Sequence, residues 1–241
     1  MQNERMRVAV LDDWQGVARQ SADWTKLLER SEVVFFEEPF SGTDKLAVAL
    51  GEFEVIIAMR ERTKFSRELL DRLPKLRMIA LTGGRTWTTD FDELNARGIP
   101  MCHTGGEKSG AATAEIALGL LLSAARFMNR GDAAIRKGGF QGGVPAGDVM
   151  DGKTLGIMGL GKIGSRMARY GEALGMQIVA WSANLTEEKA KAAGARLVDK
   201  TTLLTQSDAI SLHLVLSDRT RGIIGAPELA KMKPGAILIN T

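Results

Sequence analysis

The sequence predicts an α/β protein built from two doubly wound parallel sheets. Short apolar segments alternate with helix-like segments over residues 8–102 and again over residues 154–239. One long apolar helix pattern and a glycine-rich loop separate the two blocks. Parallel strands need long crossover connections, usually helices, so this alternation favours parallel sheets covered by helices on both faces.

The first block supplies the strands and helices of the first predicted sheet. Each predicted strand is a short apolar run, and the segments between the strands have helical character. The predicted strands are Val8–Leu11, Val33–Phe36, Val55–Met59, Met78–Leu81 and Ile99–Cys102. The predicted helices are Trp24–Arg30, Lys45–Leu50, Arg67–Leu73 and Phe91–Arg97.

The alternation breaks after residue 104 and resumes at residue 154. Between these points, a helix pattern runs from Ala111 to Arg130 and a glycine-rich loop covers residues 138–147. The second block has a helix over Ser165–Leu174 and another opened by Glu187 and Glu188. Its predicted strands are Leu155–Met158, Gln177–Trp181, Arg196–Val198, Ala209–Leu214 and Ala236–Ile239. We expect one domain over residues 1–104 and a second over 105–241, with the long helix at their junction.

Composition narrows the class of protein. Hydrophobic residues make up 44% and charged residues 25% of the 241, as in ordinary soluble proteins, and the net charge is only +3. The basic residues are scattered, so we expect no nucleic-acid partner. We expect no membrane partner, because the apolar run Ala111–Ala125 is interrupted by Glu115 and is shorter than the about 20 residues that span a bilayer. The single cysteine, Cys102, suits a reducing cytoplasm.

A glycine motif opens the second block. An apolar strand runs directly into Gly159-Leu160-Gly161-Lys162-Ile163-Gly164, and a helix-forming segment follows. Gly159 would permit a tight turn, Gly161 the close approach of a pyrophosphate, and Gly164 close packing of helix on strand. Unpaired N–H groups at the helix N-terminus would hold the phosphate. We therefore predict a dinucleotide site for NAD or NADP, against the alternative of a structural glycine turn.

The end of the next strand bears on the choice of dinucleotide. A carboxylate about 20 residues past the glycines usually binds the ribose 2′-hydroxyl. Here Ser182 stands in that place, and no acidic residue occurs before Glu187. The Ser182 hydroxyl and the Asn184 amide could bind the 2′-hydroxyl without repelling a 2′-phosphate, so the pattern does not favour strict NAD preference. That Ser182 merely caps a turn is an equally good interpretation.

The histidines and the cysteine fit structural roles better than catalysis. Imidazole titrates near neutrality, so His103 and His213 are candidate general acids or bases. His213, however, alternates within an apolar strand, as expected for a strand-end residue packed beside the cofactor. His103 ends a strand beside Cys102, which has no other activating partner and is expected to be a small buried residue. We expect no metal site.

Two segments of the first block are candidate anion sites. Arg60 and Arg62 close the third predicted strand, and parallel sheets present ligands at the carboxyl ends of their strands. A guanidinium there suits bidentate capture of a carboxylate, although an exposed surface arginine explains it equally well. Thr82-Gly83-Gly84-Arg85 follows the fourth strand, and its glycines could offer backbone N–H groups to an anion.

Together these residues resemble the D-isomer-specific 2-hydroxyacid dehydrogenases, the family of phosphoglycerate and glycerate dehydrogenases. The resemblance covers nearly the whole chain. It rests on the glycine motif, Ala114-Glu115, the segment from His213 to Gly222, and Met232-Lys233-Pro234-Gly235-Ala236-Ile237-Leu238-Ile239-Asn240-Thr241. It implies a flavodoxin-like substrate-binding (lid) domain over 1–104 and a Rossmann nucleotide-binding domain over 105–241. Such proteins transfer a hydride between NAD(P) and a D-2-hydroxy acid/2-oxo acid pair, and the family's dimers imply a homodimer packed through the junction-helix region.

The resemblance also implies roles for individual residues. Arg60 and the backbone of Gly84 and Arg85 match positions on the carboxylate side of the substrate. The lid's usual Gly-x-Gly-x-Asp run reads Gly83-Gly84-Arg85-Thr86-Trp87 here, which puts unusual bulk at the substrate mouth. Positions that would contact the cofactor comprise Lys162 and Ile163 at the pyrophosphate, Leu214 and Val215 at the adenosine, and Thr113 and Thr241 near the nicotinamide.

The family's catalytic residues are expected beyond Thr241. In the family, an Arg that polarises the 2-oxo group, a Glu and a proton-exchanging His all follow the motif that ends in Asn240-Thr241. A returning segment then completes the first domain. We therefore expect a truncated part of a longer enzyme, with its second domain incomplete, inactive and poorly folded by itself. Two alternatives stay open, a dinucleotide-binding regulator of the corepressor type and an inactive fragment.

Overall fold

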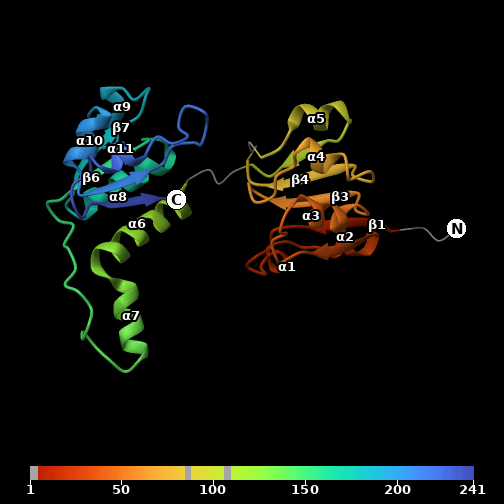
Figure 1. Cartoon of the computed structure of the whole chain (residues 1–241), viewed down its shortest axis with the longest axis horizontal. Coiled ribbons are helices and arrows are strands. Elements are labelled where there is room, and N and C mark those ends of the chain that lie inside the picture. Colours follow the sequence, from red (N-terminus) through yellow and green to blue (C-terminus); the bar gives the residue numbers. More distant parts are fainter. Residues whose placement is uncertain (1–4, 85–87, 106–109) are drawn as a thin grey trace. The chain divides into compact units, whose positions relative to one another are not determined.

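The computed structural model describes residues 5–84, 88–105 and 110–241. The chain forms two compact units, Met1–Glu107 and Lys108–Thr241, each built on its own five-stranded sheet (Figure 1). Every strand pairing is parallel, from β1 with β2 in the first unit to β10 with β9 in the second. The predicted fold class, two doubly wound α/β sheets, is confirmed.

The first unit has the strand order β2-β1-β3-β4-β5, which is the flavodoxin-like order. The order reverses between β1 and β3, so the crevice for a ligand is expected at the carboxyl ends of these two strands. Its strands are β1 (Met6–Val10), β2 (Ser31–Phe35), β3 (Val55–Met59), β4 (Met78–Thr82) and β5 (Met101–His103). Its helices are α1 (Ala18–Ser21), α2 (Thr25–Arg30), α3 (Thr43–Leu50), α4 (Arg67–Leu70) and α5 (Phe91–Ala96).

Three helices cover one face of this first sheet. Ile56 and Ile79 from the central strands pack with Leu50 of α3, Leu69 of α4 and Leu94 of α5, all of them fully buried. Side-chain caps fix where two of the helices begin: the Ser66 hydroxyl caps α4 and the Asp90 carboxylate caps α5. This layer holds the carboxyl ends of β1, β3 and β4 in place.

The opposite face of the first sheet is partly bare. An apolar cavity of about 470 Å³ lies over it, bordered by Leu27 of α2 and by Pro100. The strand residues that line this cavity, which we call the open face, are Met6, Val8, Val55, Ile57, Met78 and Ala80. Apart from Val8, which is 1% exposed, these residues are half-buried and alternate with buried ones on the same strands, as the pleat of a sheet requires.

The second unit has the strand order β10-β9-β6-β7-β8, the order of the first five strands of a Rossmann sheet. The reversal lies between β6 and β9. Its strands are β6 (Thr154–Met158), β7 (Gln177–Trp181), β8 (Arg196–Leu197), β9 (Ala209–Leu212) and β10 (Ile237–Asn240). Its helices are α6 (Ala111–Arg126), α7 (Met128–Arg136), α8 (Lys162–Ala173), α9 (Glu187–Ala192), α10 (Lys200–Gln206) and α11 (Ala226–Leu229).

The long predicted helix Ala111–Arg130 is two helices. It breaks at Phe127, whose φ of 51° is left-handed, and the two parts meet at a bend of 70°. The returning loop explains the break, because the Asp148 N–H donates to the Ala125 carbonyl and occupies an acceptor of the helix end. In the described part of the chain, no single helix is long and apolar enough to cross a bilayer. The bent pair α6–α7 is long and apolar enough when its two helices are taken together, by length and composition alone.

Smaller differences concern short elements. α1, α10 and α11 were not predicted, and each has four to seven residues, too few for a clear helical period. The predicted strand Ala209–Leu214 ends at Leu212. The chain then turns away at His213, so His213 and Leu214 belong to the loop at the carboxyl edge rather than to the strand.

Candidate functional site

Two of the three motif glycines are required by the protein's own packing. Gly159 has a φ of +98°, and a Cβ there would lie 2.6 Å from the His213 carbonyl oxygen. A Cβ on Gly164 would lie 2.1 Å from the Gly159 carbonyl oxygen. These values bear out the tight turn at Gly159 and the close approach of α8 to the β6 loop at Gly164.

Gly161 differs from both, because nothing in the protein requires it to be glycine. Its φ is −86°, open to any residue, and no atom lies within 4 Å of a Cβ built on it. Gly161 is the N-cap of α8, and no side chain caps this helix. The first N–H groups of α8, beginning with Lys162 and Ile163, therefore have no capping side chain, and an uncapped helix start of this kind suits a pyrophosphate.

The β9 loop lies directly against the glycine motif. Leu214 Cδ2 lies 2.9 Å from the position of a Gly159 Cβ, whereas Val215 is 85% exposed. The loop is held by Thr220, whose hydroxyl donates to the Val215 carbonyl at 2.7 Å. The structure thus brings Leu214 to the predicted cofactor site and leaves Val215 on the surface beside it.

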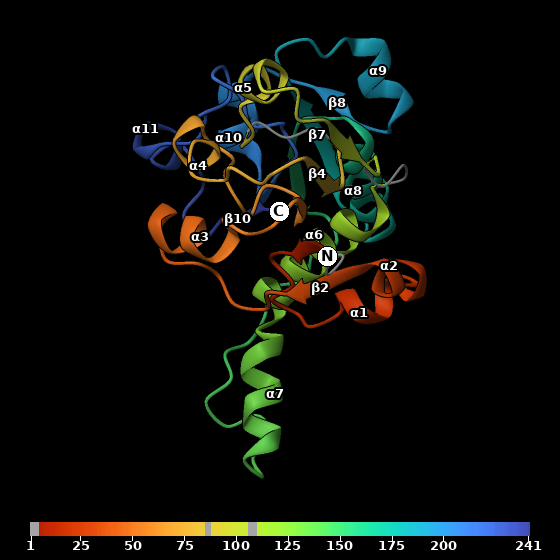
Figure 2. The same cartoon turned by 90° about the vertical axis from the view of Figure 1, so that its right-hand side faces the viewer.

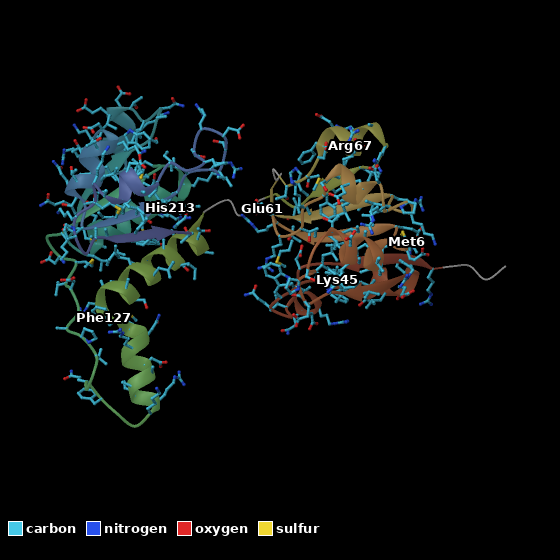
Figure 3. The ribbon with its side chains drawn as sticks, in the orientation of Figure 1. Met6, Lys45, Glu61, Arg67, Phe127 and His213 are labelled. Atoms are coloured by element: carbon cyan, nitrogen blue, oxygen red, sulfur yellow. The ribbon has the colours of Figure 1, made fainter. Side chains whose placement is uncertain are left out.

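His213 is half-buried in the second unit, where Figure 3 labels it. Its Nε2 lies 2.8 Å from the Ser211 hydroxyl, and its Nδ1 is buried with no hydrogen-bond partner among the described residues. Burial lowers the pKa of His213 from 6.5 to about 4, because the charged ring would lose its hydration. The ring is neutral at pH 7 and is a poor general acid there, in line with the packing role predicted for it.

The other predicted cofactor residues lie at ends of elements of the second unit. Ser182 follows β7, and its carbonyl accepts the Leu185 N–H at 3.1 Å in a turn that includes Asn184. Thr113 is in the first turn of α6, which packs against β10, and Thr241 directly follows β10. No interaction with a ligand tests these positions, so they stay predictions.

In the first unit, Arg60 lies at the carboxyl end of β3, beside the β4 loop. Figure 3 labels its neighbour Glu61 at the carboxyl end of this sheet, opposite Met6 at the amino end. The Arg60 N–H donates to the Thr82 carbonyl, and its side chain passes over Gly83, 3.4 Å from a Cβ built there. The Arg60 side chain is 61% exposed, with its Nε 3.5 Å from the Glu61 carboxylate. Arg60 is thus an accessible cation at the carboxyl edge of the first sheet.

The glycines after β4 are not equally available to an anion. The Gly83 N–H already donates to the Thr104 hydroxyl at 2.9 Å. Gly84 has no atom within 4 Å of a Cβ built on it, so its surroundings are open. Arg85, with Thr86 and Trp87, lies outside the described residues, and its predicted role stays a prediction.

Sequence reasoning missed a buried acid at the end of β1. Asp12 is 6% exposed, and both of its carboxyl oxygens lie 3.0 Å from the Thr63 hydroxyl. Burial raises the pKa of Asp12, an effect opposed by the hydrogen bond from Thr63 and the charge of Arg62. The Arg62 guanidinium donates to the Asp12 carbonyl at 2.5 Å and stacks 4.4 Å from the centre of the Trp14 ring. The two consecutive acids at the end of the first strand were the available signal.

The prediction that Cys102 is buried is wrong. β5 is an edge strand, and Cys102 is exposed on it. His103 is also exposed, and its Nδ1 accepts the Gly105 N–H at 3.2 Å. Among the described residues, no three His, Cys, Asp or Glu side chains gather as a metal-binding group.

Comparison with known proteins agrees with this geometry. The family model for the NAD binding domain of D-isomer specific 2-hydroxyacid dehydrogenases matches residues 118–241. The glyoxylate reductase of Thermococcus litoralis is 40% identical over 185 residues, which are 74% of this chain and 56% of the relative. The hydroxypyruvate reductase of Thermotoga maritima is 33% identical over 217 residues, 90% of this chain and 69% of the relative.

The same likeness extends to solved structures. The structure of the phosphoglycerate oxidoreductase from Vibrio cholerae has a TM-score of 0.90 and 34% sequence identity, and the match covers 98% of this chain and 75% of that one. The chain spans about half to two thirds of the length of the two curated relatives above. A strand–glycine–helix cradle for NAD(P) thus coincides with a match over the NAD binding domain, and the chain belongs to the family of D-isomer-specific 2-hydroxyacid dehydrogenases.

Proposed function

We propose that the whole protein is an NAD(P)-dependent oxidoreductase that interconverts a D-2-hydroxy acid and its 2-oxo acid. The first unit is the substrate-binding lid domain (1–104), and the second is the nucleotide-binding domain (105–241). Bound NAD(P) supplies the hydride to the 2-oxo carbon or accepts it from the hydroxy acid. The chain's own residues bind and orient both molecules, and the proton is exchanged by residues expected beyond Thr241.

The observation that carries this proposal is the open surroundings of Gly161 at the uncapped start of α8. Contacts inside the protein account for Gly159 and Gly164 but not for Gly161, and a ligand that approaches the backbone closely would account for the third glycine. A pyrophosphate on the uncapped first turn of α8 accounts for it. In this proposal Leu214 borders the adenosine, and Ser182 and Asn184 bind the ribose hydroxyls.

Calorimetric titration of NADH and NADPH into a Gly161→Val variant tests the proposal. We expect folding to be unchanged, because a Cβ on residue 161 has no atom within 4 Å, and affinity to fall at least tenfold, because the side chain occupies the pyrophosphate position. Gly142→Val is the matched control, since Gly142 also has open space around it and lies in the loop after α7. Equal cofactor affinity in wild type and Gly161→Val would contradict the proposed pyrophosphate site at the start of α8.

On the substrate side, Arg60 is proposed to bind the carboxylate of the 2-oxo acid, with the backbone of Gly84 and Arg85 beside it. The support is its exposure and its place next to the β1/β3 reversal. The homodimer and the cytoplasmic location are part of the same proposal. The dimer is supported by the apolar surface of α7 and its following loop, and the location by the single cysteine.

A further inference from the structure

Two residues with left-handed backbone conformation follow β1 and β3, the strands between which the order of the first sheet reverses. Apart from glycines, the described residues with positive φ are Asp12 at 65°, Arg60 at 53° and Phe127. Asp12 follows β1 and Arg60 follows β3, the strands between which the order reverses. Left-handed backbone is unfavourable for an L-residue, and arginine has no short polar side chain to relieve it locally. Arg60 must therefore be held in this conformation by its surroundings.

The surroundings that hold Arg60 are a short turn tied to the β1 loop. The turn comprises residues 60–63 and is closed by the Arg62 N–H, which donates to the Met59 carbonyl at 3.3 Å. Thr63, its last residue, donates its hydroxyl to the Asp12 carboxyl group. The Arg62 guanidinium donates to the Asp12 carbonyl. The first residue of the turn is thus fixed by β3 and β4, and the last two are fixed by Asp12.

The two arginines of the turn have different environments. The Arg62 guanidinium contacts the Asp12 carbonyl and the Trp14 ring, so its side chain links the turn to the loop after β1. Arg60 projects from the turn with most of its side chain exposed. Asp12 and Thr63, which join the loops, are buried beneath the surface at 6% and 8% exposure. The buried pair therefore links the β1 loop to the end of the turn that carries Arg60.

We propose that Asp12 is a positioning residue, which holds the turn over residues 60–63 through Thr63 and thereby presents Arg60 to the carboxylate of the 2-oxo acid. This inference rests on the proposed function, because it needs Arg60 to bind substrate. It predicts that loss of the Asp12 carboxyl group weakens substrate binding only while Arg60 is present.

A double-mutant cycle in the whole protein tests this dependence. Arg60→Ala should raise the KM for the 2-oxo acid by one to two decades, the value of a charge-assisted contact. Asp12→Gly keeps the positive φ without strain and retains the backbone carbonyl that Arg62 uses, so it removes only the carboxyl group. It should raise the same KM about fivefold to tenfold, with kcat and the KM for NADH unchanged. In the Arg60→Ala background, Asp12→Gly should change KM by less than twofold.

Two further variants separate positioning from a general loss of structure. Asp12→Asn tolerates the left-handed conformation and keeps an oxygen for Thr63, so it should restore nearly the wild-type KM. Asp13→Asn is the matched control, because the Asp13 carboxylate accepts the N–H groups of Val17 and Ala18 in its own loop. An unchanged KM in Arg60→Ala would overturn the substrate role of Arg60 itself. A wild-type KM in Asp12→Gly, or effects that simply multiply in the double variant, would overturn positioning alone.

A second measurement does not depend on catalysis. Trypsin cleaves after arginine only where the backbone can open, so a tied turn resists cleavage after Arg60 and Arg62. Asp12→Gly should speed cleavage at these two bonds severalfold, read by mass spectrometry, and leave cleavage after Arg19 in α1 unchanged. Equal cleavage after Arg60 and Arg62 in wild type and Asp12→Gly would show that the carboxyl group does not hold the turn.

Discussion

At the residue scale, the end of β7 governs the choice between NAD and NADP. Ser182 offers a hydroxyl and no charge, so wild-type protein should discriminate weakly or favour NADP. Ser182→Asp should shift the ratio of NAD to NADP affinities at least tenfold towards NAD, because a carboxylate repels the 2′-phosphate. Titration calorimetry with both cofactors measures the ratio.

The control for this prediction is Thr186→Asp. Thr186 caps α9, and aspartate caps equally well, so this variant adds the same charge four residues away without disturbing the helix. It should leave the ratio nearly unchanged. Strong preference of the wild type for NAD would mean that another group holds the ribose, and the interpretation of Ser182 would be wrong.

His213 should make the second unit sensitive to acid. Its pKa is about 4 in the folded protein and 6.5 in the unfolded chain, so the unfolded chain binds the extra proton between these values. Stability is therefore lost as pH falls from 6.5 towards 4, and the loss levels off below 4. His213→Gln cannot take up this proton, so its free energy of unfolding should fall less than that of wild type between pH 7 and pH 5. The difference between the two falls should be on the order of 1–2 kcal/mol.

Thermal melting between pH 7 and pH 4.5 checks the effect of His213. The quantity compared is the slope of Tm against pH, since other acidic groups also contribute to acid unfolding in both proteins. His103→Gln is the control, because His103 is exposed and belongs to the first unit. Parallel slopes in wild type and His213→Gln would contradict the burial of a neutral ring.

Local sequence signals made the cofactor loop predictable, whereas the hydrogen bonds between distant residues of the first unit could not be predicted from any local pattern. Gly159, Gly161 and Gly164 have distinct roles that follow from their spacing within one strand–loop–helix segment. The bond between Asp12 and Thr63 joins residues 51 positions apart and depends on which strands become neighbours. The engagement of the Gly83 N–H by Thr104 has the same origin, and no local pattern indicates it.

At the scale of elements, the strands and the longer helices follow from apolar spacing, but the end of α6 does not. The helix ends at a phenylalanine, Phe127, and not at a glycine or proline, so the sequence carries no helix-stop signal at this position. The stop comes from the loop that returns along the helix. A Cβ on Gly147 would lie 2.7 Å from the Arg126 Cα, so loop and helix pack too closely for any larger residue.

The break at Phe127 turns α7 away from the rest of its unit in both views (Figures 1 and 2). α7 and the loop after it carry exposed apolar residues, among them Ile135 at 61% and Phe140 at 72%. Such a surface is typical of an interface between protein chains. We expect a homodimer formed through α7.

Light scattering during size-exclusion chromatography checks the dimer. Replacing Ile135 and Phe140 together with Glu should convert it to monomers, because burying two carboxylates in an apolar interface is strongly unfavourable. Val48→Glu is the matched control, since Val48 is 80% exposed but lies on α3. A wild-type protein that remains monomeric at high concentration would contradict the proposed interface.

At the scale of the whole molecule, both sheets place their candidate residues at a strand-order reversal. Arg60 lies where β1 and β3 separate, and the glycine motif lies where β6 and β9 separate. This much follows from the alternation of strands and helices and from the rule that ligands bind at such points. The sequence does not show which face of the first sheet lacks cover, because strands with apolar residues on both faces are typical of a fully covered parallel sheet.

The open face of the first sheet should bind apolar dyes. A cavity of about 470 Å³ lined by apolar strand residues should raise the fluorescence of anilinonaphthalene sulfonate with the 241-residue chain. Ile57→Gln should reduce that signal severalfold, whereas Val48→Gln should not, because Val48 lies outside the cavity. An equal signal from wild type and Ile57→Gln would show that the dye binds elsewhere.

The open face also affects the protein while it is being synthesised. Residues 1–107 of the first unit form one continuous stretch of chain and leave the ribosome before the second unit is made. At about 5–20 residues per second, the second unit then takes on the order of ten seconds to make. Throughout that interval the nascent chain carries a partly covered apolar sheet face, which a ribosome-associated chaperone can bind and which can aggregate with neighbouring chains on the same messenger RNA.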